Sequence, residues 1–137
     1  MDDFLKLRGD GPILLVNDDD ADAWLLRRCY EMSALDNELI RLGSALELME
    51  YLREIVAGSA RMPALIMLEL RMPGFDPLHM LRLIDSIPDQ PPAQVLVFTH
   101  SQDPYQRQQS SRLGVTAWRA LAADPAETIE YFNSLAA

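Results

Sequence analysis

Cysteine is nearly absent from this chain. Cys29 is the only one among 137 residues, so no intrachain disulfide can form. This suits a reducing compartment, and the apolar stretch around Cys29 predicts a small core residue rather than a nucleophile. No apolar run approaches the ~18 residues of a membrane span, and the acidic N-terminus lacks the regions of a secretory signal. We therefore expect a cytoplasmic protein that makes no membrane contact.

Basic residues are also scarce. Lys and Arg number 12 against 21 Asp and Glu, which gives a net charge of −9. Nucleic-acid-binding proteins neutralise phosphates with clustered Lys and Arg, so this composition argues against direct DNA or RNA contact. It favours basic proteins or a metal ion as partners, and an evenly spread solubility charge is the alternative.

Motifs of several enzyme classes are missing as well. His79 and His100 lie far apart in sequence, without the spacing of a metal site, and we expect structural or surface roles for them. Ser110 and Ser111 lack the Gly-x-Ser-x-Gly elbow of a hydrolase, and no Gly-rich phosphate loop is present.

What the chain does contain is an alternation of two kinds of segment. Residues 13–16, 64–68 and 95–98 are short apolar runs bounded by Pro, Gly or polar residues. Such runs suit strands that are buried on both faces of a parallel sheet. Residues 39–42 and 115–118 are weaker strand candidates.

Helical patterns fill the gaps between these runs, over residues 23–32, 46–55, 78–87, 104–113 and 125–135. Ser44 and Glu47 form a candidate capping box for the second helix, and Asp124 with Pro125 suits the start of the last. The order is βα repeated five times, which predicts an α/β, doubly wound parallel sheet with helices on both faces. We expect one domain over residues 1–137, with its core from about 11 to about 136.

In such sheets, functional residues gather at the carboxyl ends of the strands. The segments that end there are residues 13–20 (ILLVNDDD), 64–76 (ALIMLELRMPGFD), 95–101 (VLVFTHS) and 113–118 (LGVTAW). Together they resemble the CheY-like receiver domain of bacterial two-component response regulators. The resemblance covers nearly the whole chain and implies the flavodoxin-like strand order 2-1-3-4-5.

In that family, two acids after the first strand and an acceptor Asp hold Mg²⁺, and a hydroxyl with a Lys then contacts the phosphoryl oxygens. The resemblance assigns the acid pair to Asn17 and Asp18, so one carboxylate is an amide here. It assigns the acceptor to Glu69, the hydroxyl to Thr99 and the lysine to Leu121. Departures at Asn17, Glu69 and Leu121 predict a pseudo-receiver that does not transfer phosphoryl groups and is not an enzyme.

Glu69 has two interpretations at the acceptor position. Its extra methylene moves the carboxylate ~1.5 Å outward, enough to spoil in-line attack. The same extension carries a negative charge towards the place of a phosphoryl group, which Glu69 would mimic only in part because it supplies a single charge. The alternative is that Glu69 has drifted after loss of function.

The other residues of the acidic pocket have more modest roles. Asp18 is a candidate metal ligand, with a carboxylate stabilised by backbone N–H groups as the alternative. We expect no cofactor, with bound Mg²⁺ as the alternative. Asp19 belongs to the same pocket, and Asp20 is expected to be the N-cap of the first helix. Trp118 stands at the aromatic switch position of the family, and a fixed, exposed binding anchor is the alternative.

The leading hypothesis is a module that binds another signalling protein without phosphorylation. The resemblance implies a face, and a homodimer contact, within about residues 104–135, which are polar enough for a regulated interface. A second hypothesis is a working phosphoacceptor that uses Asp18, Asp19 or Asp76 with Mg²⁺. A third is a small-molecule sensor that uses the vacated pocket.

Overall fold

The computed structural model describes residues 5–74, 76–87, 93–100, 103–121 and 124–136. Within these ranges the five strands are β1 (Ile13–Val16), β2 (Leu39–Leu42), β3 (Leu65–Leu68), β4 (Gln94–Thr99) and β5 (Ala117–Ala120). Their order in the sheet is β2-β1-β3-β4-β5, and all neighbours are parallel. The predicted doubly wound sheet and its strand order are confirmed. Phe75 and Ser101, within two of the segments quoted above, lie outside the described residues.

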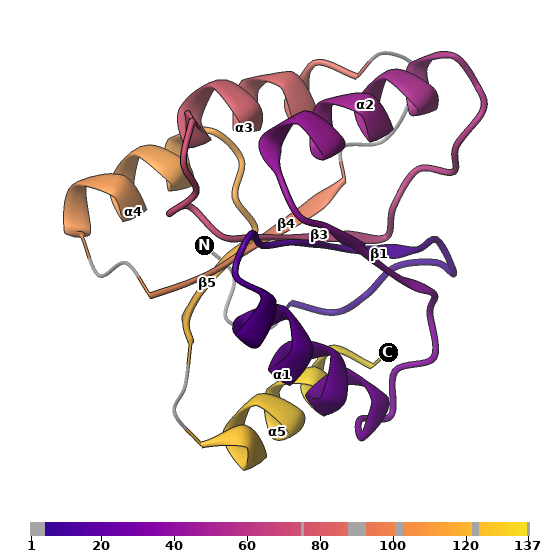
Figure 1. Cartoon of the computed structure of the whole chain (residues 1–137), viewed down its shortest axis with the longest axis vertical. Coiled ribbons are helices and arrows are strands. Elements are labelled where there is room, and N and C mark those ends of the chain that lie inside the picture. Colours follow the sequence, from indigo (N-terminus) through magenta and orange to yellow (C-terminus); the bar gives the residue numbers. More distant parts are fainter. Residues whose placement is uncertain (1–4, 75, 88–92, 101–102, 122–123, 137) are drawn as a thin grey trace.

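The helices of the described ranges are α1 (Asp20–Glu31), α2 (Ala45–Val56), α3 (Pro77–Asp85), α4 (Pro104–Arg112) and α5 (Pro125–Leu135). Figure 1 shows α1 and α5 on one face of the sheet and α2 and α3 on the other, with α4 beside α3. Both faces are covered, as a parallel sheet requires. In the part of the chain that is described, no helix has the length and apolar character to cross a membrane.

The alternation of side chains along β1 builds two separate cores. Leu14 and Val16 face α2 and α3, whereas Ile13 and Leu15 face α1 and α5, where Phe132 lies. All four β1 residues are at most 2% exposed. Burial on both faces is the reason that this strand has a continuous apolar sequence rather than an alternating one.

Each helix in the described ranges begins with a side chain that accepts a backbone N–H hydrogen bond, supplied by Asp19, Ser44, Asp76, Asp103 and Asp124. The predicted caps at Ser44 and Asp124 are confirmed. The prediction for Asp20 is wrong, because the Asp19 carboxylate caps α1 by accepting from the Asp22 N–H at 2.9 Å. Asp20 is instead the first residue of the helix.

The last strand lies two residues later than residues 115–118, where the sequence pattern placed it. The Val115 N–H donates to the carbonyl of Ser110 at 3.2 Å, so Val115 still closes the end of α4. Gly114, with φ of 87°, makes the turn between them. As a result, Trp118 lies inside β5, paired with Val97 of β4.

The buried core also includes Leu5 and Leu7, which precede the expected core boundary. The Leu7 N–H donates to the carbonyl of Leu135 at 2.9 Å. This segment therefore packs with α1 and α5 as part of the same domain.

Candidate functional site

Glu69 directly follows β3 and lies at the carboxyl edge of the sheet. It is only 4% exposed. Its Oε1 accepts a hydrogen bond from the Thr99 hydroxyl at 2.7 Å and another from the Arg71 backbone N–H at 2.8 Å. A buried carboxylate is thus held by one donor at the end of β4 and one in the loop after β3.

Asn17 follows β1 at the same edge, because Val16 and Leu68 are register partners in neighbouring strands. It is 1% exposed, and its Oδ1 accepts from the Asp19 N–H at 2.9 Å. An amide N–H needs an acceptor, so this bond fixes which side of the Asn17 amide is oxygen and leaves Nδ2 as a donor on the other side.

Two polar atoms of this site have no hydrogen-bond partner among the described residues. They are Nδ2 of Asn17 and Oε2 of Glu69, both buried. One is a donor and the other an acceptor. Buried groups of this kind are normally satisfied by an ordered water or a bound ligand.

Trp118 is buried at 9% exposure and packs among side chains of α2 and α3. The alternative of an exposed aromatic anchor is therefore wrong. The physical reason is that Trp118 pairs with Val97 and lies on the face of the sheet that belongs to the core with α2 and α3. Thr99 and Trp118, which we expected to belong to one switch, lie on neighbouring strands and on the same face of the sheet, because Trp118 pairs with Val97, two residues before Thr99.

Comparison with solved structures agrees with this geometry. The chain is 28% identical to the Mn²⁺-bound response regulator Rcp1, with 90% of this chain and 89% of that one covered and a TM-score of 0.76. It is 27% identical to the phosphorylated cyanobacterial phytochrome response regulator RcpA, with coverages of 91% and 90% and a TM-score of 0.77. The bacteriophytochrome response regulator RtBRR is 29% identical, with coverages of 91% and 77% and a TM-score of 0.74.

The structural neighbours of this chain are response-regulator receiver domains. No family model matches the sequence, and no curated protein matches it either. The likeness is therefore carried by the fold, at 27 to 29% sequence identity.

Leu121 occupies the position that the resemblance to receivers assigns to a lysine. Its backbone N–H donates to the Thr99 carbonyl at 3.0 Å, and its half-buried side chain packs on the α1 and α5 side of the sheet. The only lysine of the chain is Lys6, whose Nζ donates to the Ser134 carbonyl at 2.7 Å, in the last turn of α5. No lysine therefore replaces Leu121 in this receiver fold.

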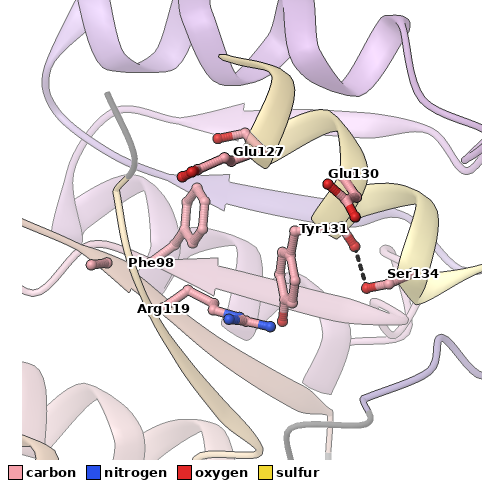
Figure 2. A pocket seen from close by; sticks show the side chains of 8 residues that line it. Phe98, Arg119, Glu127, Glu130, Tyr131 and Ser134 are labelled. Atoms are coloured by element: carbon pink, nitrogen blue, oxygen red, sulfur yellow. Dashed lines mark hydrogen bonds between the residues drawn. The ribbon is translucent and has the colours of Figure 1, made fainter. Parts of the chain in front are cut away.

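Arg119 is the nearest basic residue in sequence to Leu121, and we expected strand alternation to turn its side chain to the opposite face of the sheet. Figure 2 shows its side chain directed towards α5, and its guanidinium carbon lies 4.3 Å from the centre of the Tyr131 ring. The prediction is wrong, because positions two apart share a face of a strand and Leu121 packs on this same α1 and α5 side. Arg119 nevertheless contacts Tyr131 rather than Glu69.

Arg41 is a residue that sequence reasoning missed. From β2, its Nη2 and Nε donate to the Asn17 carbonyl at 3.1 and 3.3 Å, and its Nη1 lies 2.8 Å from Oδ1 of Asp20. The only signal in the sequence was an arginine inside an otherwise apolar strand candidate. His100, expected at the surface, is exposed and pairs with Asp22 at 2.9 Å.

The three aspartates after Asn17 differ in their roles. Asp18 is exposed, Asp19 caps α1, and Asp20 pairs with Arg41. Asp76, an alternative acceptor in one hypothesis, caps α3 by accepting from the N–H groups of Leu78 and His79. Asp18 is thus the one of these carboxylates that carries neither a cap nor an ion pair within the described residues.

The residues present do not fit the Mg²⁺ that receivers use. Mg²⁺ requires several oxygen ligands in near-octahedral geometry. Here Asn17 has its oxygen bonded to Asp19 and offers a donor instead, and Oε1 of Glu69 already accepts two hydrogen bonds. Among the described residues, no group of three or more His, Cys, Asp or Glu side chains is arranged to hold a metal.

Proposed function

We propose that this chain is a pseudo-receiver: a module of the response-regulator type that binds another cytoplasmic signalling protein without being phosphorylated, and that is not an enzyme. The observation that carries the proposal is the hydrogen bond from the Thr99 hydroxyl to Glu69 at 2.7 Å. In receivers this hydroxyl contacts the phosphoryl group. Here the carboxylate of Glu69, at the acceptor position, accepts the hydrogen bond from the Thr99 hydroxyl directly.

The same bond favours the interpretation of Glu69 as a partial mimic over simple drift. A drifted side chain would have no reason to keep a buried charge in contact with the hydroxyl of the switch, because burial of an unpaired carboxylate is costly. Glu69 instead accepts hydrogen bonds from two donors. Trp118, on the strand next to that of Thr99, is buried. We propose that the switch of this domain is held in one state by its own residues.

Phosphoryl transfer to this site is disfavoured by three independent features. The amide of Asn17 removes a metal-binding carboxylate, the longer side chain of Glu69 displaces the nucleophile, and Leu121 removes the cation that would hold the product. A substitute acceptor at Asp19 or Asp76 would have to give up a helix cap.

The partner-binding face of the proposal lies within residues 104–135, of which 122 and 123 lie outside the described residues. Figure 2 shows Arg119, Glu127 and Glu130 around one pocket between β5 and α5. No ion pair joins these three side chains within the described chain. In a two-fold dimer, the same patch faces itself, so Arg119 of one copy is opposite the glutamates of the other. We propose a homodimer through this patch.

The phosphorylation part of the proposal is tested by intact mass after incubation with acetyl phosphate and Mg²⁺. The wild type is expected to gain no phosphoryl group, whereas a variant with Glu69→Asp, Leu121→Lys and Asn17→Asp is expected to gain one. A phosphoryl group on the wild type would overturn the proposal and would require its acceptor, Asp18 first, to be mapped.

The dimer part is tested by light scattering on a sizing column. Arg119→Glu is expected to give monomers, and Arg119→Glu combined with Glu127→Arg and Glu130→Arg is expected to restore the dimer, because the charges are then exchanged. A wild type that stays monomeric at high concentration would refute this interface while leaving the phosphorylation result untouched.

A further inference from the structure

The corner between β1 and α1 concentrates negative charge. Asp18, Asp19, Asp20 and Asp22 fall within five consecutive positions. Like charges this close repel one another unless something compensates them. In receivers that compensation is a divalent cation, so the question is what supplies it in this chain.

Three of the four aspartates find a partner inside the described chain. Asp19 accepts the Asp22 N–H at 2.9 Å, Asp20 lies 2.8 Å from Arg41, and Asp22 lies 2.9 Å from His100. These contacts come from α1, β2 and the end of β4. The corner is therefore compensated by side chains and a helix N-terminus, which favours carboxylates by its dipole.

Arg41 has the most extensive contacts of these partners. Its planar guanidinium carries five donors, and it uses three of its nitrogens here, two on the Asn17 carbonyl and one on Asp20. It thereby joins the first residue of the loop after β1 to the first residue of α1. Its side chain is 30% exposed, so this positive charge is partly shielded from solvent.

Asn17 complements Arg41 from the buried side of the corner. Its Oδ1 is bonded to the Asp19 N–H, and its unpartnered buried Nδ2 is a donor. A metal ion needs an acceptor from this position and receives a partially positive N–H group instead.

We infer that Arg41 and Asn17 together make this corner independent of a divalent cation. Arg41 supplies the positive charge from within the chain, and Asn17 excludes the metal from the position where a receiver binds it. Arg41 is a positioning residue, since it acts by holding the loop. The inference deepens the proposed function, because a switch that needs no metal is uncoupled from phosphoryl donors and also from the Mg²⁺ that serves them.

The test is thermal unfolding, followed by circular dichroism, of the full chain in EDTA and in millimolar MgCl₂ or MnCl₂. The variants are Asn17→Asp, Arg41→Ala and the two combined, with Arg82→Ala as a control because Arg82 is an exposed arginine on α3 without a described ion pair. We expect the wild type and the control to unfold at the same temperature in EDTA and in metal.

The combined variant is expected to unfold at a lower temperature in EDTA and to gain several degrees when metal is added, since a ligand that binds only the folded state stabilises it. A wild type that gains as much as the combined variant would overturn the inference. An unresponsive combined variant would also overturn it, because Arg41 and Asn17 would then not be what excludes the metal. If Arg41→Ala does not fold, Arg41→Gln replaces it in the combined variant. If that variant also fails to fold, the metal response of the nearly isosteric Asn17→Asp variant tests the inference.

Failure of this inference is distinguishable from failure of the proposed function. Metal binding is measured without a phosphoryl donor, and phosphorylation is measured by mass. A wild type stabilised by Mg²⁺ that still gains no phosphoryl group would refute the inference and leave the pseudo-receiver standing.

Discussion

Replacing Thr99 by valine removes one hydroxyl from the centre of the site and keeps the shape of the side chain. Thr99 is fully buried, and its hydroxyl donates to Oε1 of Glu69 at 2.7 Å. A hydrogen bond to a charged group contributes about 1.5–3 kcal/mol to stability. The variant also leaves the 4%-exposed carboxylate of Glu69 with the Arg71 N–H as its remaining described donor.

We therefore expect Thr99→Val to lower the free energy of unfolding by about 1.5–3 kcal/mol, measured by urea denaturation. For a domain of this size the corresponding fall in Tm is roughly 5–10 °C. Thr128→Val is the matched control. Thr128 is also buried, at 5% exposure, but no described hydrogen bond joins its hydroxyl to a carboxylate, so we expect little change.

Thr99 has further contacts besides Glu69, so the single variant measures more than one interaction. A double-mutant cycle with Glu69→Met isolates the pair, because contacts that only one of the two residues makes cancel. We expect a coupling energy above about 1 kcal/mol. A loss below about 0.5 kcal/mol in Thr99→Val, together with a coupling near zero, would refute the reasoning that Glu69 holds the switch hydroxyl.

Three further predictions follow from burial. Burial, and then the charge of Asp36, raise the pKa of Tyr30 from 10.0 to about 12. The folded state favours the neutral phenol. Its contribution to the free energy of unfolding is therefore complete below pH 10.0 and is lost as the pH rises through about 12. We expect the free energy of unfolding, measured by denaturant titration, to fall by roughly 3 kcal/mol across this pH window. In the Tyr30→Phe variant this pH dependence should disappear. In the Trp24→Phe variant, the fluorescence emission of the remaining Trp118 should be blue-shifted and weakly quenched by acrylamide, because Trp118 is buried. In the Trp118→Phe variant, the emission of Trp24, which is 65% exposed, should be red-shifted and strongly quenched. Equal quenching of the two variants would contradict the burial of Trp118. Burial raises the pKa of the Cys29 thiol, which is 2% exposed, so a thiol reagent should modify it only after unfolding, and rapid reaction of the folded protein would refute this.

Secondary structure was readable from the sequence because its signals are local. The apolar run at residues 13–16 and the weaker candidate at 39–42 became strands with those bounds, and Asp124 with Pro125 opened the last helix. Each of these patterns depends on neighbours within a few positions. The right-handed crossover then predicts a doubly wound parallel sheet, whereas the order 2-1-3-4-5 was implied by the resemblance to receiver domains. Strand β5 begins two residues later than the sequence pattern placed it. Its predicted first residue, Val115, instead donates its N–H to the Ser110 carbonyl at the end of α4.

The identities at the carboxyl edge were also readable: an amide at Asn17, a longer acid at Glu69 and an apolar Leu121 are facts of the chain. What they contact was not. The bond between Thr99 and Glu69 joins residues 30 positions apart, and Arg41 reaches the Asn17 carbonyl across 24 positions.

Such partners meet only because parallel strands bring their carboxyl ends to one edge, and the side-chain rotamers that complete each contact depend on packing from both faces. The sequence alone therefore determined the βα alternation of a doubly wound sheet and the loss of the usual acidic and basic residues. The tertiary structure decided that Glu69 takes the Thr99 hydroxyl, that Trp118 is buried, and that Arg41 stands beside the acidic corner, because those outcomes depend on distances between segments that no local pattern encodes.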